Sequence, residues 1–439
     1  MLNAVATAFK IPDLRQRILF VLGMLIIFRF FAAVPVPGVN REGLQDFIQQ
    51  NALLGILNIF SGNSLQNFSI VALGVYPYIT ASIIMQLMTP IIPSLNELSN
   101  EGQGGRNKIN QYTHWLTVPL ALLQGYGQGV LFSQQVDPAT GQPLIEGFGF
   151  GDPANVLPTI ATLVTMTAGT MLLVWMGELI TEFGIGNGVS IIIFGGIVAS
   201  LPSSIMALFS GPSDTRSIIS LALFLLIGLL TIVGIVLINE GQRRIPVHHA
   251  KRVRSGRMYG GNTTFIPLKV NSAGMIPLIF AVSILVFPGL IAQFLSTSSN
   301  ETLRNFAAQL SAWMSPNTFQ YNVIYFLLVV AFTYFYTMVI FQQQKIAENL
   351  QRQGAFIPGV RPGRNTQLYL MRTLNRITLI GALFLGTVAI LPFIASRLTG
   401  VNSLLLGATS LLIVVGVAID TMRQLEAQLV MRNYEGFIR

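Results

Sequence analysis

Side chains that commonly do chemistry are scarce in this chain. It has no cysteine, which excludes a thiolate nucleophile, a disulfide and a cysteine-ligated metal. Its three histidines, His114, His248 and His249, lie outside the long apolar stretches, and we expect no metal site from them. No phosphate-binding G-x-x-x-x-G-K-S/T loop occurs, and the glycine runs complete no dinucleotide-binding fingerprint. The sequence predicts no catalytic residue, metal or cofactor, and any energy must come from a partner or a gradient.

Arg29 is the only charged side chain within the long apolar stretches between residues 18 and 419. A secondary transporter with inverted repeats needs ionisable or ion-coordinating groups at membrane depth. An intramembrane protease needs a Ser/His pair or paired aspartates there. The apolar stretches supply neither set, so we expect no enzyme, and a transporter for a small solute is kept as the alternative function.

The scarce charges separate long apolar stretches that predict membrane spans. Hydrophobic residues make up 52% of the chain and charged residues 10%, whereas about a quarter of residues are charged in a typical soluble domain. At about 1.5 Å per residue the stretches reach roughly 26 to 35 Å, the thickness of a hydrocarbon core. They cover residues 18–34, 75–92, 115–132, 156–177, 189–209, 217–239, 274–295, 321–341, 377–395 and 402–419. The predicted fold is an all-α polytopic membrane protein with ten transmembrane helices.

Basic residues predict the orientation of these spans. With a cytoplasmic N-terminus, 21 of the 26 Lys and Arg fall inside, Arg29 lies in the membrane, and Arg41, Arg216, Arg304 and Arg397 fall outside. This asymmetry follows the positive-inside rule, so we expect both termini in the cytoplasm and a retained first helix. Part of the basic charge is this ordinary topology signal, and part could dock an acidic partner or nucleic acid.

A weak internal repeat predicts two halves. Residues 188–193 are similar in character to residues 408–413, about half a chain later. Five spans per half is an odd number, so residues 1–210 and 211–439 would form inverted halves with a pathway between them. The alternative is that two Ile/Leu-rich helices are alike in composition only.

Residues 53–74 are too polar and too rich in glycine to cross lipid, yet they lead directly into a span. Such backbone is tolerated at membrane depth only where it lines or fills a protein cavity. We therefore expect a re-entrant segment or a stopper. The alternative is an amphipathic helix on the outer membrane surface.

Seven motifs, in order along nearly the whole chain, resemble the SecY family, the central subunits of the bacterial protein-export channel. They occupy residues 58–62 (NIFSG), 72–79 (ALGVYPYI), 101–113 (EGQGGR with QYT), 184–188 (GIGNG), 241–245 (GQRRI), 267–271 (PLKVN) and 356–363 (FIPGVRPG). The resemblance implies a channel for unfolded polypeptides, whose two halves surround an hourglass pore that opens across the membrane and sideways into lipid.

By this resemblance, a ring of aliphatic side chains forms the waist of the hourglass. Its expected members are Val75, Ile79, Val189, Ile193, Ile279 and Ile413. The two pairs spaced i, i+4 would each face one side of their helix. A narrow aliphatic constriction dewets and blocks ions without selecting one peptide sequence.

The resemblance also implies a plug over about residues 58–73, a short displaceable segment on the outer side of the ring. Its expected residues are Asn58, Phe60, Ser61, Gly62, Leu65, Phe68 and Leu73. Because the segment is rich in glycine, asparagine and glutamine, we expect few buried apolar contacts and a low cost of local release.

For sideways opening, the resemblance implies that spans two and three part from spans seven and eight. The expected gate residues are Thr80, Ile83, Gln124, Asn271 and Phe287, with Thr80, Gln124 and Asn271 forming a polar cluster. Polar contacts between membrane helices contribute about 0.6 kcal/mol on average in one measured system. A gate held this weakly could respond to a signal peptide.

Two basic loops, 241–273 and 342–376, are too short to be domains and are expected on the inner face. Their expected docking residues are Arg243, Arg244, Lys251, Arg252, Arg254, Arg257 and Arg361. Basic loops can bind ribosomal RNA, anionic lipid or an acidic protein. The resemblance implies SecE and SecG as companion subunits, the SecA motor and the ribosome as partners, signal peptides and nascent polypeptides as clients, and a bacterial inner-membrane location.

Overall fold

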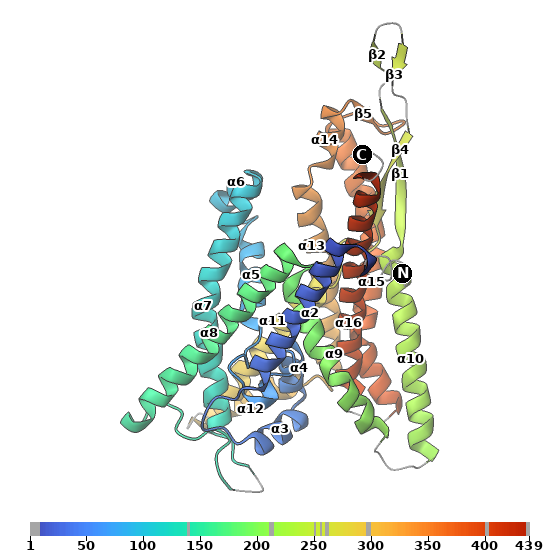
Figure 1. Ribbon diagram of the computed structural model, residues 1–439. Helices are drawn as coiled ribbons and strands as arrows, with labels where there is room; N and C mark the ends of the chain where they lie inside the picture. Colours follow the sequence, from blue (N-terminus) through green and yellow to red (C-terminus); the bar gives the residue numbers. More distant parts are fainter. Residues whose placement is uncertain are drawn as a thin grey trace. The chain divides into compact units, whose positions relative to one another are not determined.

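A computed structural model describes residues 9–137, 141–209, 215–249, 252–254, 257–259, 263–295, 300–399 and 404–435, and these are mainly helical (Figure 1). The helices are α2 (Pro12–Ala33), α3 (Arg41–Gln50), α4 (Ala52–Phe60), α5 (Tyr76–Met88), α6 (Pro93–Asn100), α7 (Gln103–Ser133), α8 (Pro153–Phe183), α9 (Gly188–Phe209), α10 (Thr215–Glu240), α11 (Ile276–Leu295), α12 (Glu301–Trp313), α13 (Phe319–Gln343), α14 (Ile346–Arg352), α15 (Arg364–Thr399) and α16 (Leu404–Glu435), with the 3-10 helix η1 (Leu65–Asn67). The strands are β1 (Gln242–His249), β2 (Arg252–Arg254), β3 (Arg257–Tyr259), β4 (Thr263–Lys269) and β5 (Ala355–Phe356).

Each predicted span falls on one helix: α2, α5, α7, α8, α9, α10, α11, α13, α15 or α16. Among the described residues, four helical stretches are long and apolar enough to cross a membrane, or five if the bent pair α5 and α6 counts as one. The four are Pro12–Ala33, Pro153–Phe183, Phe319–Arg352 and Arg364–Ala395. Shorter apolar helices occur in α9, α10 and α11. The chain is therefore a multi-pass membrane protein, and the count of ten stays a prediction.

Helix α5 shows how the sequence sets the ends of one span. Pro77 lies in its first turn, where the missing N–H of proline needs no partner. Ile92 is extended before Pro93, as steric contact with a proline ring favours. The chain then turns by 98° into α6. The helix of this span is consequently shorter than the predicted stretch 75–92.

The fold is mainly helical as predicted, but the segment 241–273, predicted as a loop, contains strands. Strands β4, β1 and β5 form an antiparallel sheet in that order, and β2 pairs with β3 at the far end of the β1–β4 hairpin (Figure 1). On β1, Ile245 and Val247 are buried whereas Arg244 and Pro246 are exposed. This alternation is typical of a half-buried strand, and it is the signal that the search for spans overlooked.

The chain divides into two compact units. The first contains residues 1–226, 282–322 and 392–439, and the second contains residues 227–281 and 323–391. In the second unit a hydrophobic cluster joins β1, β4 and β5 to α13 and α15; its buried members are Ile245, Val247, Leu268, Phe341, Ala355, Ile357, Leu370, Leu374 and Ile377. The first unit takes residues from both predicted halves, so the inverted halves stay a prediction.

Candidate functional site

Five of the six predicted ring residues belong to the first unit, on α5, α9 and α16 or at the N-terminus of α5. Val75, Ile79, Ile193 and Ile413 are buried. The amide of Ile79 donates to the carbonyl of Val75 at 3.0 Å, which places these two side chains one helical turn apart on the same face. Aliphatic side chains from three helices of this unit are therefore available for a constriction.

Val189 and Ile279 differ from the other four. Val189 is half-buried, and its Cγ2 lies 3.1 Å from the position that a Cβ on Gly177 would take, so it packs against α8. Ile279 belongs to the second unit. The assembly of all six side chains into one ring stays a prediction.

The predicted plug, residues 58–73, is much more buried than the sequence led us to expect. Phe60, Leu65, Phe68 and Leu73 are among the largest fully buried side chains of the described chain, and Asn58 and Ser61 are also buried. The ring of Phe68 packs edge-on against Phe132 of α7, with the centroids 5.7 Å apart. The expectation of few buried apolar contacts is wrong. The short polar side chains form hydrogen bonds within the segment, and the large apolar side chains pack against the elements around it.

Hydrogen bonds within the segment show how its polar atoms are satisfied. Asn58 donates from Nδ2 to Asn63 Oδ1 at 3.1 Å and accepts from the amide of Gln66 at 3.1 Å. Ser64 Oγ lies 2.7 Å from the carbonyl oxygens of both Ser61 and Val71. Buried polar groups are tolerated when they are paired in this way. The segment is therefore an ordered, internally bonded element.

The segment is also bound to the elements around it. The amide of Val36 donates to the carbonyl of Phe68 at 2.9 Å, and that of Ile70 to the carbonyl of Val34 at 3.0 Å. Helix α4 packs against α9 and α16, two of the helices that carry predicted ring residues. A segment packed in this way is not a helix on the membrane surface, so the surface alternative is wrong.

A buried hydrogen bond joins α5 to α11 at the predicted gate. Tyr76 Oη donates to the carbonyl oxygen of Ser283 at 3.1 Å, and both residues are buried. Of the predicted gate residues nearby, Ile83 is buried on α5 and Phe287 is exposed on α11. The sequence analysis passed over Tyr76, although it stands between the two ring residues of its helix.

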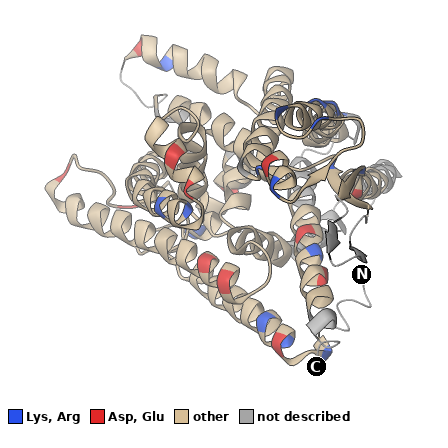
Figure 2. Ribbon diagram, turned by 90° about the horizontal axis from the view of Figure 1, so that it is seen from above, with Lys and Arg blue, Asp and Glu red and all other residues tan. Residues whose placement is uncertain are grey.

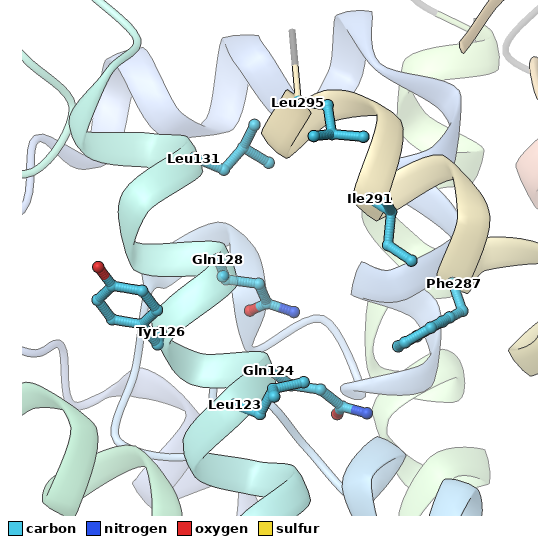
Figure 3. Close-up of a pocket in the computed structure, with 9 residues that line it drawn as sticks. Leu123, Gln124, Tyr126, Gln128, Leu131, Phe287, Ile291 and Leu295 are labelled. Carbon is cyan, nitrogen blue, oxygen red and sulfur yellow. The ribbon is translucent and has the colours of Figure 1, made fainter. Parts of the chain in front are cut away.

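A cavity of about 330 Å³ opens between α7 and α11 within the first unit. Figure 3 shows Gln124 and Gln128 of α7 pointing into it, opposite Phe287 and Ile291 of α11. Both glutamines are more than nine-tenths buried, and neither amide atom of Gln124 has a hydrogen-bond partner among the described residues. The cavity therefore combines an apolar lining with polar groups that can still form hydrogen bonds.

The predicted polar cluster takes Thr80 and Gln124 from the first unit and Asn271 from the second, so its assembly stays a prediction. Thr80 Oγ1 donates to the carbonyl of Tyr76 in its own helix at 3.0 Å. Asn271 Nδ2 donates to Asn239 Oδ1 at 2.7 Å and to the carbonyl of Gly274 at 3.1 Å, all within the second unit. Thr80 and Asn271 therefore each have a hydrogen-bond partner within their own unit, and the partner of Asn271 on α10 is one that spacing along the sequence could not reveal.

The structure brings the two basic loops together. His248 and His249 of β1 pair with Phe356 and Ala355 of β5, so one sheet contains strands from both loops. His249 Nε2 lies 2.9 Å from Thr264 Oγ1, a contact across β1 and β4. The two histidines thus take part in the sheet.

Several predicted docking residues border this sheet. Arg243, Arg244 and Arg361 are exposed. Arg252 and Arg254 lie on β2 and Arg257 on β3, whereas Lys251 lies outside the described residues. We call β1, β4, β5 and residues 357–363 the basic sheet.

Charged residues are sparse elsewhere, and Figure 2 shows most of the ribbon without them. Within the described ranges, no three His, Asp or Glu side chains gather where a metal ion could bind.

Solved structures with the same fold are channels. The chain matches a protein-conducting channel with a TM-score of 0.63 at 16% identity, covering 97% of both chains. It matches a SecY protein, studied for how its plug domain stabilises the closed translocation channel and maintains a membrane seal, with a TM-score of 0.60 at 17% identity and 97% of both chains. Sec61 in a canine ribosome–channel complex from the endoplasmic reticulum matches with a TM-score of 0.58 at 14% identity, again over 97% of both chains.

Sequence relatives cover the full length. The chain is 43% identical to the protein translocase subunit SecY of Streptomyces scabiei, over 100% of both chains. It is 44% identical to that of Thermotoga maritima, over 100% of this chain and 98% of the relative. The SecY family profile matches residues 69–422. The chain therefore belongs to the SecY family, whose members are protein translocation channels and not enzymes.

Proposed function

We propose that this chain passes unfolded secretory polypeptides across the membrane and releases hydrophobic segments sideways into lipid. The observation that carries the proposal is the position of residues 58–73, a segment rich in polar residues that continues from α4. Helix α4 packs against α9 and α16, two helices with predicted ring residues, and Asn63 of the segment bonds to Gly196 of α9. In a membrane channel, a packed segment of this kind can block the pore, and no catalytic reaction is needed to close it. The alternative of a secondary transporter for a small solute is not supported, since the relatives are translocase subunits.

The seal in the idle state rests on apolar surface. Ring residues such as Ile79, Ile193 and Ile413 offer no hydrogen bonds to water, so a narrow passage between them empties of water and excludes ions. A passing polypeptide displaces the plug and takes its place, and aliphatic walls accept polar and apolar stretches alike. The driving force comes from outside the chain.

Sideways release would begin at the cavity between α7 and α11. Its apolar lining suits the hydrophobic core of a signal peptide, and its volume of about 330 Å³ accommodates large side chains. Gln124 and Gln128 could hydrogen-bond polar atoms of the entering segment. Breaking the hydrogen bond from Tyr76 to Ser283 would let α5 and α11 part.

The basic sheet is the proposed docking surface for the SecA motor and for ribosomal RNA. Exposed guanidinium groups bind phosphates and carboxylates through paired hydrogen bonds. Related channel structures include a ribosome-bound Sec61 and a ribosome-bound Ssh1 complex. SecE and SecG would complete the complex in the bacterial inner membrane, with both termini of this chain in the cytoplasm and anionic lipid around the basic loops.

Cysteine crosslinking can test whether the ring residues line the path. The chain has no cysteine, so Ile79→Cys or Ile193→Cys provides a single thiol. In the assembled complex, each should crosslink to a secretory polypeptide arrested in transit. Ile26→Cys on α2, where the native side chain is 70% exposed, is the matched control and should not. Equal crosslinking at all three positions, or none at the ring positions, would count against the proposed path.

A further inference from the structure

Arg29 has no role in the function proposed so far, yet it is the only charged residue in the first span. Its Nη1 donates a hydrogen bond to the carbonyl oxygen of Gly62 at 3.2 Å. Gly62 lies in the plug, so this bond joins α2 to a segment 33 residues away in sequence. Charged residues in membrane helices are costly and usually functional, which makes the contact worth explaining.

The plug turn at Gly62 is in backbone contact with α9. A Cβ built on Gly196 would overlap the Cα of Gly62. Gly62 has a φ of +69°, and a Cβ there would lie 2.6 Å from Cζ of the buried Phe28 on α2. Only glycines allow this approach, because any side chain would separate the two backbones.

Hydrogen bonds hold the same turn from two sides. Arg29 donates to the carbonyl of Gly62, and Asn63 Nδ2 donates to the carbonyl of Gly196 at 3.2 Å. The first bond comes from α2 and the second reaches α9, so the turn is fixed between two helices of the first unit. Arg29 is exposed on α2, and its bond to Gly62 is partly buried. Hydrogen bonds from a charged donor are stronger than those from a neutral one.

We propose that Arg29, Gly62 and Gly196 form a latch that holds the plug closed, with Arg29 as its positioning residue. The proposal rests on residues 58–73 being the plug. Arg29 lies four residues before the end of α2, about one helical turn from the membrane surface in the proposed orientation. When the turn leaves, the guanidinium can extend to water or lipid phosphate, so release does not strand a charge in lipid.

Two independent substitutions should release the latch. Arg29→Leu removes the donor without adding a polar group to the span. In Gly196→Ala the added methyl group would overlap backbone atoms of Gly62, which cannot rotate aside as a side chain can, so the whole turn must move away from α9. Their matched controls are Arg29→Lys, which keeps a charged donor, and Gly195→Ala, whose Cβ would meet only the end of the Leu25 side chain at 2.5 Å.

The readout is access to the plug in the assembled complex in bilayers. Val71→Cys provides one thiol at a position that is fully buried in the closed arrangement. Its labelling rate by a membrane-impermeant maleimide should rise about tenfold or more in Arg29→Leu, as loss of one charge-assisted hydrogen bond predicts. It should also rise in Gly196→Ala, where the added methyl group displaces the turn. Arg29→Lys and Gly195→Ala should stay near the parent rate. Ion conductance should follow the same order.

Deletion of residues 60–70 separates the latch from the plug itself. A rise in conductance on deletion, with unchanged labelling in Arg29→Leu and Gly196→Ala, would overturn the latch alone. No rise on deletion would overturn the plug function and the latch together. Equal labelling increases in Gly195→Ala and Gly196→Ala would overturn the latch, because they would point to general loosening of α9.

Discussion

The plug and the basic sheet are both polar segments between apolar helices, but the plug is largely buried whereas the basic sheet is largely exposed. Phe68 in the plug is 0% exposed, whereas Phe265 in the basic sheet is 58% exposed. The plug's polar residues are mostly asparagine, glutamine and serine, whose short side chains bond to nearby backbone. The basic sheet instead carries the long cationic side chains of Arg243, Arg244 and Arg361, which need solvent or a charged partner. The kind of polar residue, more than the amount of polarity, separates the buried segment from the exposed one.

The two segments also use backbone hydrogen bonds differently. In the sheet, the antiparallel ladder from Gln242↔Lys269 to His248↔Thr263 pairs the backbone groups with a neighbouring strand. In the plug, turns closed by backbone bonds, such as that from the amide of Phe68 to the carbonyl of Leu65, are supplemented by side chains: Ser61 Oγ and Asn58 Oδ1 accept from the backbone amides of Leu65 and Gln66. Phe68 itself holds a left-handed backbone with φ 40°. A bulky residue in this conformation is strained, so packing must compensate. The plug consequently depends on its side chains in a way that the sheet does not.

The largest difference is expected from removing an aromatic ring in each region. Phe68→Ala should lower the free energy of unfolding by about 3–5 kcal/mol, the usual cost of removing a buried phenylalanine from a protein core. Phe265→Ala should change it by less than about 0.5 kcal/mol, because the ring is exposed. Thermal unfolding of the complex in detergent measures both.

Conductance sharpens this first comparison. Phe68→Ala should also raise ion leak, whereas Phe265→Ala should not. Similar stability losses for the two variants would mean that the plug is not the better packed of the two segments.

A smaller difference is expected from removing one hydroxyl in each region. Ser64 is fully buried, and its hydroxyl lies within hydrogen-bond distance of the carbonyl oxygens of Ser61 and Val71. Ser64→Ala should therefore lower the free energy of unfolding by about 1–3 kcal/mol. Ser272, beside the basic sheet, donates to the carbonyl of Lys269 at 3.1 Å where water can replace it. Ser272→Ala should therefore be nearly neutral. Amide hydrogen exchange over residues 61–74 reports the first effect, and unchanged protection in Ser64→Ala would contradict it.

The positions of the helices could be predicted from the length of the apolar stretches, whereas the contacts at the site could not. Each predicted span falls on a helix, because a segment of about twenty apolar residues can satisfy its own backbone hydrogen bonds within a membrane only as a helix. Plug burial was mispredicted, since composition does not show that Asn58 and Ser64 bond internally.

Long-range pairs were hidden for a similar reason. The bonds from Tyr76 to Ser283 and from Arg29 to Gly62 link residues 207 and 33 positions apart. Spacing along one helix carries no information about such partners. The alternation around Ile245 was readable, however, and a search for strands between spans would have found β1.

The smallest effect on stability is expected from Arg361, in the basic sheet. Arg361→Glu should leave the free energy of unfolding within about 0.5 kcal/mol of the parent, because the side chain is exposed. It should nevertheless abolish SecA-driven export, since a guanidinium that pairs with a partner's carboxylate or phosphate becomes a repelling charge. Membrane insertion of this chain itself should be unimpaired.

Arg304→Glu is the control, because Arg304 is also exposed but lies on α12, on the predicted outer side. It makes the same change in charge and should leave export intact. Export by reconstituted complexes, measured over a range of salt concentrations, separates the two, since electrostatic docking weakens as salt rises. Unimpaired export in Arg361→Glu would remove the docking role from the basic sheet. The exposure of the basic sheet would then reflect only the need of its arginines for solvent. The contrast between the plug and the basic sheet would be a difference in packing and not in function.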